Sequence, residues 1–170
     1  RQACSWMRGK LVEFGCDSTY LDTWNSQDAP NVVGVKTGSV HPELIYIIDG
    51  HIDNTSDLAP YNCPGSDDNA SGCVAMLAIA KAMMVERPKR SVIFVWHTAE
   101  ERGLIGAYYF VQHSPVPVEK ITANLNFDMI TRNDPNGIYL IGTTTLSTEL
   151  DKSFQDANAS IKLTLDYKYD

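Results

Sequence analysis

The chain has 170 residues, of which 44% are hydrophobic and 21% charged, an ordinary balance for a globular protein with a core of its own. Its formal net charge of −7 argues against nucleic acid or an anionic membrane surface as a partner. No apolar run approaches the ~20 residues that a membrane-spanning helix needs. We expect a single domain over residues 1–170, because no linker, repeat or low-complexity segment divides the sequence.

The first fifty residues predict a helix followed by three strands. Apolar residues recur with nearly helical spacing over 1–14, and Gly15 is a suitable stop. The segments 18–24 (STYLDTW) and 31–38 (NVVGVKTG) are short and strand-like. The continuous β-rich run at 43–50 (ELIYIIDG) is typical of a strand buried on both faces.

The remaining residues alternate between helix and strand patterns. Residues 71–88 predict a strong helix that ends at Pro88, and 91–97 (SVIFVWH) predict a second buried strand. Residues 103–114 predict a helix and 121–130 a third such strand. We expect further elements at 137–142 (strand), 146–158 (helix) and 161–167 (strand). This alternation predicts an α/β fold, a three-layer sandwich with a central, largely parallel mixed sheet flanked by helices.

Three of the predicted strands lead directly into histidine or carboxylate side chains. His51 and Asp53 follow the strand 43–50, Glu100 and Glu101 follow 91–97, and Asp128 ends the pattern at 121–128. The carboxyl ends of parallel strands form the ligand crevice of an open α/β sheet, so we expect these side chains to meet. Carboxylates gathered there repel unless cations neutralise them. Imidazole and carboxylate ligands suit zinc, either as one ion or as a pair.

The adjacent residues Asp67 and Asp68 lie in the polar loop that leads into the helix 71–88. Capping of the helix N-terminus explains one acidic residue at this place, but not two in contact. This loop follows the strand 43–50, so it can reach the edge of the sheet where the other side chains are expected to meet. We therefore expect it to contribute a carboxylate to the cluster.

Four segments together resemble the M28 zinc peptidases, of the bacterial leucyl aminopeptidase type. They are DGHID (49–53), PGSDDNASG (64–72), HTAEERGLIGA (97–107) and LNFDMI (125–130), and the likeness runs from about residue 30 to about residue 130. The resemblance implies the fold of zinc-dependent exopeptidases. It also implies hydrolysis of the N-terminal peptide bond of peptides with a free N-terminus, and a secreted or periplasmic location.

The resemblance further implies a role for each residue. The metal ligands would be His51, Asp67, Glu101 and Asp128. His51 and Asp128 would hold one zinc, Glu101 the other, and Asp67 would bridge them. Glu100 would be the general base that takes a proton from the metal-activated water, and Asp53 would orient the ring of His51. A cis peptide bond is expected between Asp67 and Asp68.

One feature of the sequence departs from the resembling family. The family completes the zinc held by Glu101 with a further histidine downstream, but no histidine follows Asp128 in this chain. We expect that the chain lacks the C-terminal part of the catalytic domain; a degenerate second site is the alternative. The isolated chain should then hold one zinc well and be weakly active at best.

Other residues leave alternatives open. His97 is more plausibly a packed or supporting histidine than a ligand, and His41 and His113 are expected at the surface. The cysteines form disulfides or are buried thiols, and a bridge between Cys63 and Cys73 would brace the acidic loop. Two rival functions remain: a single-zinc cyclotransferase of the glutaminyl cyclase type, and a non-catalytic peptidase-like binding domain.

Overall fold

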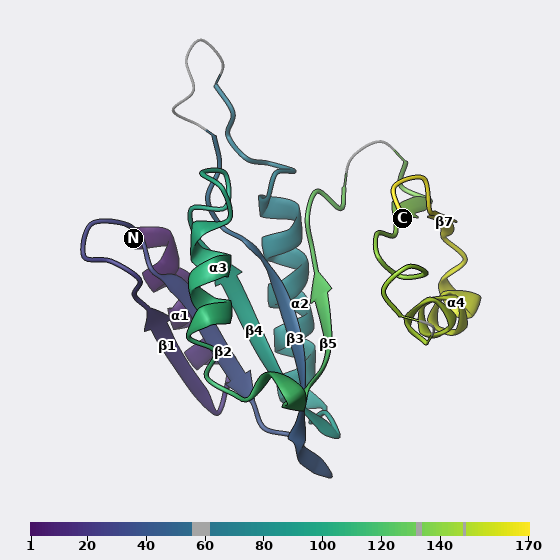
Figure 1. The fold of residues 1–170 in the computed structure, drawn as a ribbon, viewed down its shortest axis with the longest axis horizontal. Coiled ribbons are helices and arrows are strands. Elements are labelled where there is room, and N and C mark those ends of the chain that lie inside the picture. Colours follow the sequence, from purple (N-terminus) through teal and green to yellow (C-terminus); the bar gives the residue numbers. More distant parts are fainter. Residues whose placement is uncertain (56–61, 132–133, 148) are drawn as a thin grey trace. The chain divides into compact units, whose positions relative to one another are not determined.

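The computed structural model describes residues 1–55, 62–131, 134–147 and 149–170 (Figure 1). These residues form two compact units, Arg1–Met129 and Ile130–Asp170. The first unit contains α1 (Gln2–Phe14), β1 (Ser18–Asp22), β2 (Asn31–Lys36), β3 (His41–His51), α2 (Ala70–Val85), β4 (Arg90–His97), α3 (Ile105–Gln112), the 3-10 turn η1 (Val118–Lys120) and β5 (Ile121–Asn126). One domain over residues 1–170 stays a prediction.

The first unit is built on a five-stranded mixed sheet with the order β1-β2-β4-β3-β5. Strand β3 runs parallel to both β4 and β5, whereas β2 is antiparallel to β1 and β4. The three parallel strands are those predicted to lead into histidine or carboxylate residues. Since they are neighbours in the sheet, their carboxyl ends lie together at one edge.

Helices cover both faces of this sheet, which confirms the predicted three-layer sandwich (Figure 1). Helices α1 and α2 pack on one face through Leu11 and Met76, against Phe94 and Trp96 of β4. Helix α3 packs on the other face through Phe110, against Val95 and its neighbours. The central strand β4 is buried from Ser91 to His97. Burial on both faces explains why its sequence is a continuous apolar run.

The ends of the elements follow local sequence signals. Helix α1 stops at Gly15, whose φ of 94° is the left-handed conformation that glycine adopts without cost. Helix α2 is capped by Asn69, whose side chain accepts a hydrogen bond from the Gly72 amide. Strand β5 ends at Asn126, earlier than the pattern predicted, so Asp128 lies in the loop that follows.

The second unit holds a parallel two-stranded sheet, β6 (Gly137–Tyr139) with β7 (Thr164–Asp166), and helix α4 (Leu150–Ile161). The elements predicted in this part of the sequence are therefore present, although all are shorter than or shifted from the predicted ranges. Within the described residues, no helix of either unit has the length and apolar character of a membrane span.

Of the two alternatives left open for the cysteines, the bridge between Cys63 and Cys73 does not form, because all four cysteines are free thiols. The alternative of buried thiols holds for Cys4 and Cys73. Burial raises the pKa of the Cys73 thiol to about 12. Its Sγ lies 3.1 Å from the carbonyl oxygen of His51 and donates a hydrogen bond to it.

The approach of α2 to the end of β5 yields a first test. A Cβ atom at Gly72 would lie 2.3 Å from the carbonyl oxygen of Phe127, so a larger residue would push the helix away. We expect Gly72→Ala to lower the free energy of unfolding by about 1–3 kcal/mol, measured by urea denaturation. Gly9→Ala, in α1 with nothing within 4 Å, is the matched control and should raise it by up to about 1 kcal/mol. Equal stability of the Gly72 variant and the native protein would contradict the close approach.

Candidate metal centre

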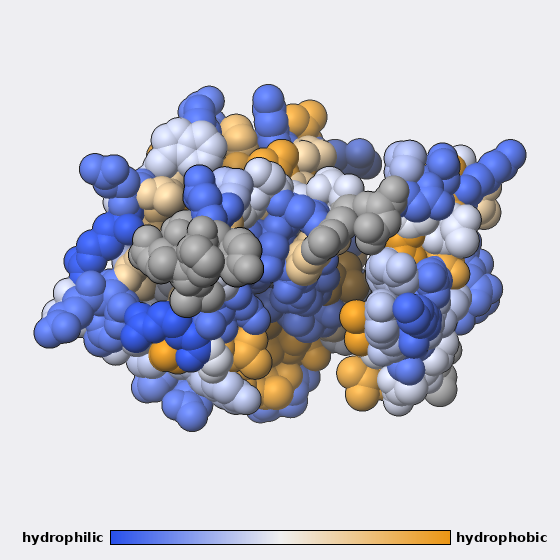
Figure 2. All heavy atoms as spheres, turned by 90° about the horizontal axis from the view of Figure 1, so that it is seen from above, coloured by the Kyte–Doolittle hydropathy of each residue, from blue (hydrophilic) through white to orange (hydrophobic). Residues whose placement is uncertain are grey.

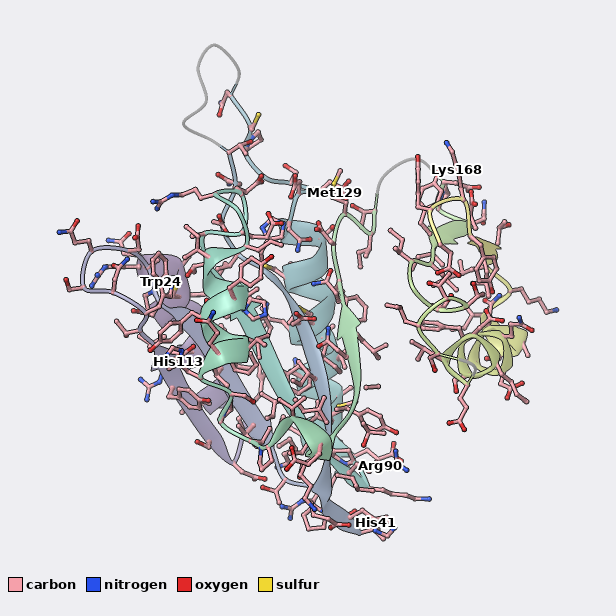
Figure 3. All side chains as sticks on the ribbon, in the orientation of Figure 1. Trp24, His41, Arg90, His113, Met129 and Lys168 are labelled. Carbon is pink, nitrogen blue, oxygen red and sulfur yellow. The ribbon has the colours of Figure 1, made fainter. Side chains whose placement is uncertain are left out.

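The side chains predicted to meet do so at the carboxyl edge of the parallel strands. His51 is the last residue of β3, Glu100 and Glu101 lie in the turn after β4, and Asp128 follows β5. Figure 3 labels Met129, the neighbour of Asp128, at this edge, whereas His41 and Arg90 lie at the opposite end of the sheet. Seen from above, the molecule shows mainly hydrophilic residues (Figure 2).

His51 is the centre of the cluster. It is 3% exposed, and its Nδ1 lies 3.1 Å from the carbonyl oxygen of Asp53, to which a protonated Nδ1 donates a hydrogen bond. Its Nε2 lies 3.1 Å from Asp68 Oδ1, 3.5 Å from Asp128 Oδ1 and 4.0 Å from Glu100 Oε2. One ring nitrogen is thus held by the backbone while the other faces three carboxylates from different segments.

Two groups of ligand atoms come close enough to hold a metal ion: His51 with Asp68 and Asp128, and His51 with Glu100 and Glu101. A tetrahedral zinc with bonds of about 2.0–2.1 Å keeps neighbouring ligand atoms about 3.3 Å apart. The distances of 3.1 and 3.5 Å from Nε2 to Asp68 and Asp128 match that spacing. In addition, the Oε1 atom of Glu101 is buried without a hydrogen-bond partner among the described residues. The donor set therefore fits zinc.

The acidic loop differs by one residue from the expectation. Asp68, and not Asp67, is the residue beside His51 in the first group. The cis peptide bond likewise joins Asp68 and Asn69, so the prediction of a cis bond between Asp67 and Asp68 is wrong. The ligand role expected of Asp67 stays a prediction, and the geometry adds Asp68 as a candidate ligand. The sequence pattern marked the pair, but only the path of the loop decides which of two adjacent side chains points to the cluster.

Asp53 does more than was expected of it. Its carboxylate lies 3.7 Å from His51 Nδ1 and accepts hydrogen bonds from the backbone amides of Glu100 (3.1 Å) and Glu101 (3.3 Å). Asp53 thus anchors the turn after β4 to the end of β3. Ala99 precedes this turn with a φ of 56°, a conformation that residues other than glycine rarely adopt. The amide contacts could not be read from the sequence, since they depend on that backbone conformation.

The cluster shifts the proton affinities of its members. Burial by itself lowers the pKa of His51, but hydrogen bonding to Asp53 and the charges of Asp128 and Glu100 raise it to about 9. Burial raises the pKa of Glu100, with a further contribution from Asp128. Burial and the neighbouring carboxylates also raise the pKa values of Glu101 and Asp128. For Asp53, hydrogen bonds from His51 and the two amides outweigh burial and lower the pKa.

His97 is a packed histidine, as predicted. It is buried, its Nε2 lies 3.1 Å from Asp49 Oδ2, and its ring meets that of Phe110 edge-on. It belongs to neither metal-binding group among the described residues. His41 and His113 are exposed, also as predicted.

Asn69 is the residue of the site that sequence reasoning missed. It is 2% exposed, and its side-chain amide contacts backbone groups on three segments around the cluster. An asparagine directly before a helix is a common N-cap, and this was the only signal available in the sequence. The contacts beyond the cap arise from the fold.

Comparisons with known proteins identify the family of this chain. A sequence model of peptidase family M28 matches residues 31–169. The chain belongs to peptidase family M28. A probable leucine aminopeptidase 2 of Aspergillus oryzae is 33% identical over 170 residues, which cover 91% of this chain and 32% of that protein.

Two solved structures of similar fold are an aminopeptidase and a cyclase. A zinc aminopeptidase of Bacillus subtilis matches 83% of this chain and 35% of its own, with a TM-score of 0.69 and 25% identity. A glutaminyl cyclase of Bacteroides thetaiotaomicron matches 92% of this chain and 63% of its own, with a TM-score of 0.72. At 17% identity the cyclase shows the shared fold alone. The M28 chain spans about a third of the length of the two aminopeptidases.

The raised pKa of His51 can be tested on the metal-free protein. We expect its ring to titrate near pH 9 by NMR with a chelator present. Since the folded pKa lies above the ordinary value of 6.5, the stability that His51 contributes is full below about pH 6.5 and is lost as pH rises through about 9. Titration of His51 near pH 6.5 would show that the carboxylates do not face its Nε2.

Proposed function

We propose that this M28 chain is part of a zinc-dependent aminopeptidase that hydrolyses the N-terminal peptide bond of peptides. The observation that carries the proposal is the position of His51 Nε2, 3.1 Å from Asp68 and 3.5 Å from Asp128. Membership of M28 and the names of the relatives support the same activity. For the full-length protein we propose a secreted or periplasmic location.

His51, Asp68 and Asp128 would hold one zinc, and Glu101 together with Asp68 would hold a second. We give Asp68 rather than Asp67 this role because its side chain is the one beside His51. Zinc in proteins usually has four ligands, and this chain would supply only two of them to the second zinc. We therefore propose that the isolated chain binds one zinc tightly and that the full protein binds two.

Bound zinc would supply electrophilic activation of the scissile carbonyl and of a water molecule. Glu100 would accept a proton from the attacking water on its carboxylate and return it to the leaving amine. The Glu100 side chain is 29% exposed, so it is accessible to substrate. Asp53 would hold Glu100 in place through the backbone amide.

The same cluster gives a reason for selecting free N-termini. Glu100 is 29% exposed at its side chain and is not assigned to zinc, so its negative charge faces incoming substrate. A protonated α-amino group would be attracted to this charge. A peptide without a free N-terminus would lack that attraction, which supports an exopeptidase rather than an endopeptidase.

The role of Glu100 is tested by kinetics of the full-length protein. We expect Glu100→Gln to lower kcat on leucine p-nitroanilide by about 10²–10⁴-fold, because proton transfer is lost, while zinc content stays unchanged. Glu43→Gln, an exposed residue of β3, is the control and should keep native kcat. Unchanged kcat in the Glu100 variant would refute its role as the general base, and no turnover by the native protein with zinc present would refute the enzyme proposal. Formation of pyroglutamate from an N-terminal glutamine peptide would instead favour a glutaminyl cyclase.

The choice between Asp67 and Asp68 is tested by zinc affinity. Asp68→Asn should weaken Zn²⁺ binding by more than tenfold in competition with a chromophoric chelator, because the ligand next to His51 loses its charge. Asp67→Asn is the matched control one residue away and should change the affinity by less than about threefold. The opposite order of effects would restore the assignment to Asp67.

A further inference from the structure

The side chain of Asn69 makes four hydrogen bonds with backbone groups. Its Oδ1 accepts from the amides of Gly72 (3.1 Å) and Met129 (3.3 Å). Its Nδ2 donates to the carbonyl oxygens of Phe127 (2.9 Å) and His51 (3.4 Å). Both ends of the amide are therefore used, and they reach three different segments.

These segments are the ones that carry the three side chains of the first metal-binding group. His51 is itself a partner, Asp68 precedes Asn69 in the chain, and Phe127 and Met129 are the two neighbours of Asp128. A single buried amide thus connects the end of β3, the start of α2 and the loop after β5. His51 Nε2 lies only 3.1 Å from Asp68 Oδ1 and 3.5 Å from Asp128 Oδ1, so small backbone shifts would alter these distances.

The surroundings leave the amide little freedom. A Cβ atom at Gly72 would lie 2.5 Å from Asn69 Oδ1, and a Cβ atom at Gly50 would lie 3.3 Å from Asn69 Nδ2. Met129 has a φ of 49°, a conformation rare outside glycine. Its backbone amide donates a hydrogen bond to Asn69 Oδ1. The loop that carries Asp128 is therefore held in an uncommon backbone conformation by this side chain.

We propose that Asn69 is a positioning residue of the metal centre, whose Nδ2 group sets the distance of Asp128 from His51. The inference rests on the proposed zinc site. The cap of α2 needs only an oxygen acceptor, which serine also supplies. The link to Phe127 needs a donor on the same short side chain, which serine cannot place there. The His51 carbonyl also receives a hydrogen bond from Cys73 Sγ, so loss of Asn69 acts mainly on the Asp128 side.

Two variants of the full-length protein separate the cap from the link. Asn69→Ala removes both, and Asn69→Ser keeps the cap alone. We expect both to bind Zn²⁺ about tenfold or more weakly than the native protein in chelator competition, the loss typical for a support of a metal ligand. The melting temperature should recover in Asn69→Ser relative to Asn69→Ala. The visible spectrum of the Co²⁺ form should change in both variants, because the Asp128 ligand moves.

The control is Ser91→Ala at the opposite end of the sheet. Ser91 is buried, donates to the Pro42 carbonyl and accepts from the Gly38 amide, so its loss lowers stability without touching the metal centre. Its Zn²⁺ affinity and Co²⁺ spectrum should stay native. Native Zn²⁺ affinity in Asn69→Ser with a loss in Asn69→Ala would assign the effect to the cap and overturn the proposal. Native Zn²⁺ affinity in both Asn69 variants would also overturn it. A native protein that binds no Zn²⁺ would overturn the proposed function itself.

Discussion

Mutual repulsion of carboxylates around one buried imidazole is the constraint on which this structure depends. Three carboxylates face His51 Nε2 within 4.0 Å, and Glu101 lies in the same cluster. Such a group is unfavourable without a positive charge at its centre. His51 meets that need in the metal-free protein through its raised pKa, and zinc would meet it in the active protein. The same repulsion that costs stability creates the affinity for a divalent cation.

The rest of the first unit serves to hold these charges together. Parallel pairing of β3 with β4 and β5 brings three strand ends to one edge, and helices pack on both faces of the sheet. Side chains between the strand ends then join the loops: Asp53 links β3 to the turn after β4, and Asn69 links β3, α2 and the loop after β5. The centre is therefore held by backbone contacts as much as by the ligands themselves.

Much of the fold, and the meeting of His51, Glu100, Glu101 and Asp128 at one edge of the sheet, could be predicted because their signals are local. The continuous apolar runs of β3 and β4 and the four M28 segments lie within short stretches of sequence. One expectation is wrong for a structural reason. The cis bond was placed between Asp67 and Asp68 from the resemblance to M28 peptidases, whereas it joins Asp68 and Asn69, directly before α2. Asn69 was missed because its partners lie up to 60 residues away in the chain.

The sequence by itself determined the α/β class, the elements of the sheet and the residues His51, Glu100, Glu101 and Asp128, because periodicity and strand-end position are properties of short segments. Only the tertiary structure decided that Asp68 faces His51, that Asp53 holds the backbone of Glu100, and that one buried amide joins three loops. These outcomes require atoms from distant segments to come within hydrogen-bonding distance. That proximity is created by strand pairing and loop conformation, and no short stretch of sequence encodes it.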